Sequence, residues 1–287
     1  MNNKMDVRNI CSERITRNVI IILFGILISA ALCVVFKDAA RWKTIEGYKQ
    51  SIAENSYVAH ALGGINGTTY TNSKEALANA NDKGFKFYEA DIRLTSDGEL
   101  VLTHGWDMFN GNPTSYSSFM ESLVQGSYTA MDFADLVQFV SEYSDVYIML
   151  DFGEQDFEYT KKAYEKIVDI AKDPEILDRM IVGGHNTKMI EAIQEVYDFK
   201  LYNLYWANKK NRVDERIDTK EEFLEYCRTN MITSISTSVS TYQTEEKAIK
   251  YLRDNGLIVY LYTIDDEAEA KRYFGKVDLI GTNFIKL

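Results

Sequence analysis

The chain contains only three histidines, and each lies where a side chain could take part in acid–base chemistry. His60, His104 and His185 each directly follow a short apolar run that is typical of a β-strand. The imidazole pKa lies near neutrality, so one histidine can accept a proton while another donates one. A single histidine is as often structural as catalytic, but three at corresponding strand ends favour a shared site.

Three carboxylates occupy neighbouring strands of the same region. Glu89 and Asp91 are two positions apart in the predicted strand Phe87–Ile92, so their side chains point to the same side, and Asp151 ends the next barrel strand. Acids this close repel each other unless a cation or a proton intervenes; an ion pair with Arg93, on the same face, is the alternative. An all-oxygen set without cysteine suits a hard ion, so we expect one divalent cation, Ca²⁺ or Mg²⁺.

The segments that must position these residues alternate between strand and helix patterns from Tyr57 onward. This alternation predicts a parallel sheet, and eight strands predict a closed (β/α)8 TIM barrel with its active site at the carboxyl ends. An open doubly wound sheet is the alternative, but no G-x-G-x-x-G loop supports it. Leu100–Thr103 follows a Ser-Asp-Gly turn and is expected to be a hairpin arm. The eight predicted barrel strands are Tyr57–His60, Phe87–Ile92, Val146–Asp151, Met180–Gly183, Lys200–Tyr205, Ile232–Ser236, Leu257–Thr263 and Val277–Gly281.

Helices are expected between these strands. Asn72 with Glu75 indicates a helix start, and Gly84 indicates its end. The further predicted helices are Asp132–Glu142, Phe157–Ala171, Asn186–Tyr197, Thr219–Arg228, Thr244–Asn255 and Asp266–Phe274.

Length and charge limit the classes of protein to which the chain could belong. The 287 residues accommodate one barrel of ~250 residues plus an extra segment. The formal net charge of -11 argues against nucleic acid as a partner, because phosphate backbones select for lysine and arginine. The three cysteines, Cys11, Cys33 and Cys227, are too scattered for a disulfide framework or a structural zinc site.

An uncharged apolar run, Val19–Phe36, is long enough to span a bilayer core, which needs ~17–25 residues. A cleaved signal peptide usually has a shorter apolar region, a lipoprotein would need a small residue where Leu32 stands, and a buried core helix is the remaining alternative. Basic residues flank both ends of the run, so they leave its orientation open. We favour an uncleaved transmembrane signal-anchor at residues 19–36.

This anchor would place residues 1–18 in the cytoplasm and the barrel, residues 57–287, outside the membrane. Residues 37–56 are expected to form an amphipathic stalk, with Trp42 suited to the membrane interface. Packing of this stalk against the bottom of the barrel is an equal alternative. The expected location is therefore a membrane, in single-pass form, in a bacterial cell envelope.

Motifs along the chain resemble those of the glycerophosphodiester phosphodiesterase family. The resemblance runs in order from about residue 57 to residue 285 and implies a phospholipase C-like barrel, a divalent metal and cleavage of a phosphodiester. The motifs that carry it are His60-Ala-Leu-Gly63-Gly64, Thr71-Asn72-Ser73, Glu89-Ala-Asp91-Ile-Arg93-Leu-Thr-Ser-Asp-Gly98, His104, Val259-Tyr-Leu-Tyr-Thr263-Ile and Val277-Asp-Leu-Ile-Gly-Thr282-Asn.

The resemblance also implies roles for individual residues. His60 and His104 would be the acid–base pair, and the metal ligands would be Glu89, Asp91 and Asp151. In the family, the hydroxyl next to the phosphate can itself attack, giving a cyclic intermediate that water opens.

The chain departs from the family pattern at three positions. Ala61 stands where the family usually has arginine, Gly153 where it has lysine, and Gly105 where it has aspartate. Two phosphate-facing cations are therefore missing, and Arg93 or Lys188 are the candidates to replace them.

Other side chains are expected to contact the substrate. Among the aromatic ones Trp106 is the strongest candidate because it closely follows His104, although core packing is the alternative for each. The expected substrate-binding residues are Arg93, Trp106, His185, Trp206 and Tyr262.

The sequence thus predicts hydrolysis of a phosphodiester, either a glycerophosphodiester or a related lipid headgroup or envelope polymer. A lyase that releases a cyclic phosphate is a variant of this reading. A catalytically weak or inactive barrel that binds a phosphate- or sugar-containing ligand is the alternative from another class. The expected partners are the phosphodiester substrate and the membrane, without nucleic acid.

Overall fold

The computed structural model describes residues 38–206, 217 and 219–287. The predicted cytoplasmic tail and the predicted span at residues 19–36 lie outside these residues. Within the described part, no helix is both apolar enough and long enough to cross a membrane. The chain divides into two compact units, Met1–Glu46 and Gly47–Leu287. The described part of the first unit, residues 38–46, is helical.

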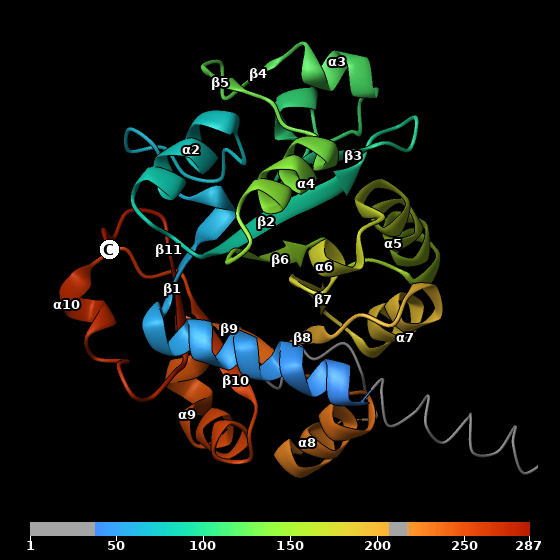
Figure 1. Ribbon diagram of the computed structural model, residues 1–287. Helices are drawn as coiled ribbons and strands as arrows, with labels where there is room; N and C mark the ends of the chain where they lie inside the picture. Colours follow the sequence, from blue (N-terminus) through green and yellow to red (C-terminus); the bar gives the residue numbers. More distant parts are fainter. Residues whose placement is uncertain (1–37, 207–216, 218) are drawn as a thin grey trace, which may run out of the picture. The chain divides into compact units, whose positions relative to one another are not determined.

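In the second unit eight parallel strands close into a ring (Figure 1). β1 pairs with β11 on one side and with β2 on the other, which leaves the parallel ring without an open edge. This closure confirms the predicted (β/α)8 barrel, and the carboxyl ends of its strands all open on one face. The strands are β1 (Tyr57–Ala59), β2 (Phe87–Leu94), β6 (Tyr147–Asp151), β7 (Met180–Gly184), β8 (Leu201–Tyr205), β9 (Ser234–Ser238), β10 (Ile258–Tyr262) and β11 (Leu279–Thr282).

Helices cover the outside of the strands (Figure 1). Apolar residues on their inner faces join one continuous core with the outward-facing side chains of the strands, as the 3.6-residue periodicity predicts. The helices are α2 (Lys74–Asp82), α4 (Phe133–Glu142), α5 (Phe157–Ala171), α6 (Pro174–Leu177), α7 (Thr187–Val196), α8 (Lys220–Thr229), α9 (Val239–Asp254) and α10 (Glu267–Ala270).

Two helix starts differ from the prediction. Ser73, not Asn72, is the cap of α2, since its side chain accepts a hydrogen bond from the Ala76 N–H; Asn72 takes a left-handed conformation instead, with φ of 46°. α9 has a kink at Glu245 (φ -117°, ψ 17°), next to the predicted start at Thr244, and Ser238 caps an additional helical stretch that begins at Val239. In both cases a short polar side chain at the strand-to-helix junction sets the boundary.

A small layer follows the hairpin arm β3 (Leu100–Leu102), which pairs antiparallel with β2 as expected. The layer comprises the 3-10 turn η2 (Asp107–Phe109), α3 (Tyr116–Met120), β4 (Leu123–Val124) and β5 (Tyr128–Thr129). Its own apolar cluster is centred on Val101 and Phe119. The sequence did not predict these elements, because they are too short to show a periodicity.

The barrel unit begins with the helical residues 47–54, in which Tyr48 is fully buried. The Tyr48 ring lies 5.8 Å from the ring of Phe87 and 5.3 Å from that of Tyr147, centre to centre. Phe87 and Tyr147 begin β2 and β6, so Tyr48 packs at the amino-terminal end of the barrel. For this part of the predicted stalk, from Gly47 onward, packing within the barrel unit is what the structure shows.

Replacing Tyr48 with alanine is expected to lower the free energy of unfolding by about 3–5 kcal/mol, the usual cost of removing a buried aromatic ring. Tyr48→Phe keeps the ring and is the matched control. The Tyr48 hydroxyl is buried without a hydrogen-bond partner among the described residues, so the control should be as stable as the wild type or slightly more so. Urea unfolding of the full-length chain measures both; an equal loss in both variants would show that the hydroxyl, not the ring, stabilises this end.

Candidate active site

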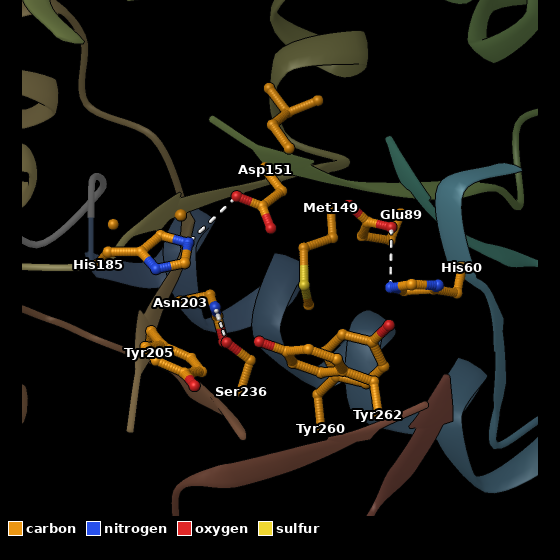
Figure 2. Close-up of a pocket in the computed structure, with 13 residues that line it drawn as sticks. His60, Glu89, Met149, Asp151, His185, Asn203, Tyr205, Ser236, Tyr260 and Tyr262 are labelled. Carbon is orange, nitrogen blue, oxygen red and sulfur yellow. Dashed lines mark hydrogen bonds and ion pairs between the residues drawn. The ribbon is translucent and has the colours of Figure 1, made fainter. Parts of the chain in front are cut away.

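A pocket opens at the carboxyl-terminal ends of the barrel strands (Figure 2). It is lined by charged and aromatic side chains from six different strands or the turns after them. These include His60, Glu89, Asp151, His185, Tyr205 and Tyr262. The barrel therefore brings together residues that are up to about two hundred positions apart in the sequence.

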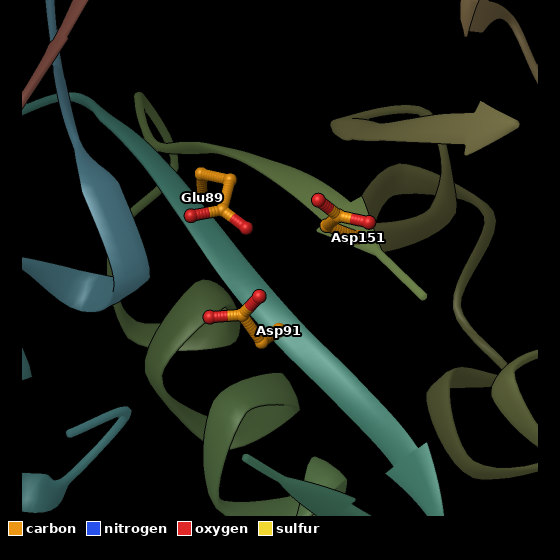
Figure 3. Close-up of side chains that lie close together, drawn as sticks. All are labelled: Glu89, Asp91 and Asp151. Atoms are coloured by element: carbon orange, nitrogen blue, oxygen red, sulfur yellow. The ribbon is translucent and has the colours of Figure 1, made fainter. Parts of the chain in front are cut away.

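Three carboxylates form a compact group beside this pocket (Figure 3). Asp91 and Asp151 are partners in the register of β2 and β6, and Glu89 lies two positions earlier on the same face of β2. One oxygen from each of the three side chains lies within 4.8 Å of the others. The strand register alone therefore places these carboxylates close together. Glu89 and Asp91 are also buried, so their charges lie in a region of low solvent access.

Burial and mutual repulsion govern the protonation of this group. Burial and the charges of Asp91 and Asp151 raise the pKa of Glu89 well above its ordinary value. Burial and the charge of Asp151 also raise the pKa of Asp91. Bound positive charge would offset this repulsion, and three oxygen donors suit Ca²⁺ or Mg²⁺. The residues present therefore fit the divalent cation that the sequence predicts.

His185 holds the third carboxylate in place. Its Nε2 lies 3.1 Å from Oδ1 of Asp151, and its ring packs 4.9 Å from the ring of Tyr205. Burial by itself raises the pKa of Asp151, but the hydrogen bond and charge of His185 outweigh it and, with the Gly153 N–H, bring that pKa to about 2. His185 thus keeps Asp151 ionised and oriented.

The loop between β1 and α2 holds the other two acids. The Ala61 N–H donates to Oε2 of Glu89 at 2.7 Å. The Asn72 amide donates to Oδ2 of Asp91 at 2.8 Å and accepts from the Asp91 N–H at 3.0 Å. The sequence analysis treated Asn72 only as a helix start. The available signal for its second role was that its motif comes directly before the strand motif that contains the acids.

His60 begins the 3-10 turn η1 (His60–Leu62) directly after β1 and is buried. Its Nδ1 lies 3.3 Å from Oδ1 of Asn283, while its Nε2 lies 3.9 Å from Oε2 of Glu89. Burial lowers the pKa of His60, and the opposing charge of Asp91 does not reverse this. His60 is therefore neutral at neutral pH and able to accept a proton.

Tyr70 lies between two of the histidines. Its ring centre is 5.1 Å from that of His60 and 4.7 Å from that of His104, which is exposed to solvent. The two imidazoles that the sequence predicts as a pair thus contact the same phenol ring. The sequence analysis did not single out Tyr70; the available signal was that it is the only aromatic residue in the loop between His60 and Asn72.

Arg93 lies beside the acidic group and binds backbone oxygens. Its guanidinium donates to the carbonyl oxygens of Asp151 at 3.2 Å and His104 at 3.1 Å. A Cβ at Gly153 would lie 3.1 Å from this guanidinium, so Arg93 fills the space that a side chain at position 153 would enter. Its charge opposes the rise in the pKa of Glu89. Lys188, in contrast, is exposed on α7.

The two tryptophans expected at the substrate lie elsewhere. Trp206 is 1% exposed and packs in the hydrophobic core, with its ring 4.5 Å from that of Phe223. Core packing, the alternative for each aromatic residue, is what the structure shows for Trp206, and its contact with a substrate stays a prediction. Trp106 packs against Phe119 in the small apolar cluster of the layer after β3 and is not among the residues that line the pocket.

The barrel thus carries histidines at the carboxyl ends of its strands and an acidic group that could hold a cation. The sequence profile described as the glycerophosphoryl diester phosphodiesterase family matches residues 63–287. The chain belongs to this family, which confirms the resemblance carried by its motifs. Among curated proteins none matches it.

Solved structures show the same fold. A glycerophosphodiester phosphodiesterase from Parabacteroides distasonis aligns with a TM-score of 0.66 and 16% identity, over 79% of this chain and 92% of that one. A phosphodiesterase from Oleispira antarctica, in complex with the product sn-glycerol-3-phosphate, aligns with a TM-score of 0.63 and 15% identity, over 80% of this chain and 93% of that one. The enzyme from Thermotoga maritima aligns with a TM-score of 0.60 and 18% identity, over 79% and 93%.

The repulsion within the acidic group predicts an unusual effect of Asp91→Asn. The folded protein holds protons on Glu89 and Asp91 more tightly than the unfolded chain does, so these groups make the metal-free protein less stable as pH rises. At about pH 8 the variant is expected to melt a few degrees higher without metal, since ~1 kcal/mol corresponds to ~2–4 °C in a domain of this size. It should lose the rise in Tm that Ca²⁺ or Mg²⁺ gives the wild type.

Asp169→Asn, at an exposed position on α5, makes the same chemical change away from the group and is the control. Its Tm and its response to metal should match those of the wild type. Thermal unfolding with and without metal, followed by circular dichroism, measures all three proteins. An unchanged metal response in the Asp91 variant would remove the metal assignment.

Proposed function

We propose that this chain catalyses the metal-dependent hydrolysis of a phosphodiester, a glycerophosphodiester or a related lipid headgroup or envelope polymer. The observation that carries the proposal is that the rings of His60 and His104 both contact the ring of Tyr70, while His60 also lies beside the three clustered carboxylates. A phosphate bound at these carboxylates through a cation would then have two imidazoles nearby, as acid–base catalysis of phosphoryl transfer requires.

The two histidines differ in a way that suits different roles. His60 is buried and neutral, so it is the group that accepts a proton from the attacking hydroxyl or water. His104 is exposed and contacts Tyr70, so it is the group that donates a proton to a departing alcohol. Bound at Glu89, Asp91 and Asp151, a divalent cation would stabilise charge on the phosphoryl oxygens.

Polar and aromatic side chains line the rest of the pocket. Tyr205, Tyr262 and His185 surround the space next to Asp151, and Asn203 donates to Ser236 at 2.9 Å on its wall. Such a lining suits the hydroxyl groups and carbon skeleton of a small alcohol better than a second charged group. The product found in the Oleispira antarctica structure, sn-glycerol-3-phosphate, supports a substrate moiety of this kind.

The missing cations favour one alternative, a barrel that binds a phosphate- or sugar-containing ligand with weak or no catalysis. Ala61 supplies only a backbone N–H, and Gly153 supplies no side chain. Arg93 supports the enzymatic proposal instead, because its charge acts on the same acidic group from beside Gly153.

The decisive test is turnover by the full-length chain with Ca²⁺ or Mg²⁺ on a panel of glycerophosphodiesters and lysophospholipids. His60→Ala and His104→Ala should each lower kcat by about 10²- to 10⁴-fold, the usual contribution of a general acid or base, and EDTA should abolish activity. Phosphorus NMR of the products separates hydrolysis from release of a cyclic phosphate. A folded, metal-binding wild type without turnover on any substrate would favour the binding barrel.

We also propose that residues 19–36 anchor the chain in a bacterial cell-envelope membrane, with the barrel on the outer side. The uncharged apolar run in the sequence supports this. Leu27→Arg, near the middle of the run, should weaken insertion by ~2.5–3.5 kcal/mol and shift the full-length chain out of the carbonate-resistant membrane fraction. A wild type already found in the carbonate-soluble fraction would contradict the anchor.

A further inference from the structure

The buried side of the His60 ring is held by residues from the far end of the chain. Asn283, directly after β11, places its Oδ1 3.3 Å from Nδ1 of His60. Asp265, after β10, accepts from the Asn283 Nδ2 at 2.9 Å with one carboxylate oxygen. With the other it accepts from the Asn283 N–H at 2.6 Å and from the Thr282 hydroxyl at 3.0 Å. A hydrogen-bond chain therefore runs from Asp265 through Asn283 to His60.

The chemistry of the carboxylate fixes the direction of this chain. An ionised carboxylate only accepts hydrogen bonds, so the donor end of the Asn283 amide, Nδ2, must face Asp265. The acceptor end, Oδ1, must then face His60. Since Oδ1 cannot donate, Nδ1 of His60 has to carry the hydrogen. The orientation of an amide is often ambiguous, but here its two neighbours leave one choice.

The contacts of Nε2, on the opposite edge of the ring, do not require a hydrogen on that atom. Nε2 of His60 lies 3.9 Å from Glu89, beyond hydrogen-bond length, and 3.5 Å from the Thr263 hydroxyl, which can act as donor. In the neutral ring the lone pair is therefore on Nε2, the atom that faces the pocket and the acidic group.

We propose that Asp265 and Asn283 are positioning residues that hold His60 in its Nδ1–H tautomer, so that Nε2 is the atom that accepts the substrate's proton. This inference rests on the proposed role of His60 as the proton acceptor. Because Asn283 is a neutral amide, the chain orients the ring without placing a carboxylate directly against it. The Asp265 charge acts one residue further away, so a proton taken up by Nε2 can still be passed on.

Nitrogen-15 NMR of the full-length, metal-free chain reads the tautomer directly and needs no substrate. With three histidines, the His60 signal is assigned from its loss in His60→Ala. At about pH 8, above the ordinary imidazole pKa of ~6.5, His60 should show the hydrogen on Nδ1. Asn283→Leu should leave a mixture of tautomers. Asn203→Leu, an equally buried amide that bonds to Ser236 and to no histidine, should leave the His60 signal unchanged.

Exchanging the side chains of Asp265 and Asn283 tests the donor-to-acceptor direction of the hydrogen-bond chain. Asn283→Asp alone sets two carboxylates against each other, and Asp265→Asn alone sets two amides together. The double variant Asp265→Asn, Asn283→Asp restores every donor–acceptor pair, because the new amide at 265 donates to the new carboxylate, which still accepts from Nδ1. Each single change should lower kcat about 10- to 100-fold, as changes to such outer partners usually do, with little effect on KM. The double variant should recover the Nδ1–H signal and part of the activity, because its carboxylate at position 283 lies directly against the ring and holds a proton on His60 more tightly.

Three outcomes would overturn the inference: hydrogen on Nε2 in the wild type, an unchanged tautomer in Asn283→Leu, or no recovery in the folded double variant. If Asn283→Leu does not fold, the double variant Asp265→Asn, Asn283→Asp decides whether the inference holds. If no substrate is turned over, the proposed function fails, while the NMR result still decides whether Asp265 and Asn283 set the tautomer.

Discussion

The mutual repulsion of three carboxylates within 4.8 Å of one another is the constraint on which the architecture of this site depends. Two of them are buried, where like charges cannot be screened by water. Each acid is held by a partner from a different part of the chain: Glu89 by the Ala61 N–H, Asp91 by the Asn72 side chain, and Asp151 by His185. The three like charges thus repel one another within the folded site, and a bound cation would offset this repulsion.

Closure of the barrel brings the acidic group next to His60, the proposed proton acceptor. β1 pairs with both β2 and β11, so the turn that carries His60 lies between the acids of β2 and Asn283 after β11. Its two ring nitrogens consequently face opposite surroundings, an ordered amide on one side and the pocket on the other. A histidine at the end of an open sheet's edge strand would have only one of these neighbours.

The loss of two family cations is accompanied by a rearrangement of positive charge. At position 153 glycine takes a left-handed conformation, with φ of 63°, and the space above it is filled by the Arg93 guanidinium. That group binds the carbonyl oxygens of Asp151 and His104, so it ties β6 to the loop that carries the second histidine. The charge is therefore used to fix the ends of strands as well as to moderate the acidic group.

The sequence by itself determined the order of strands and helices, the barrel, and the two sets of candidate site residues, because period-2 and period-3.6 patterns and motif order are local properties. It did not determine which aromatic side chains reach the pocket: Trp206 is in the core, whereas Tyr70 lies between His60 and His104. Nor could it pair Asn283 with His60, since contacts across 223 positions arise only when β1 and β11 close the ring. Spacing predicts which face a residue takes along its own strand; only the tertiary structure decides which distant residues share that face.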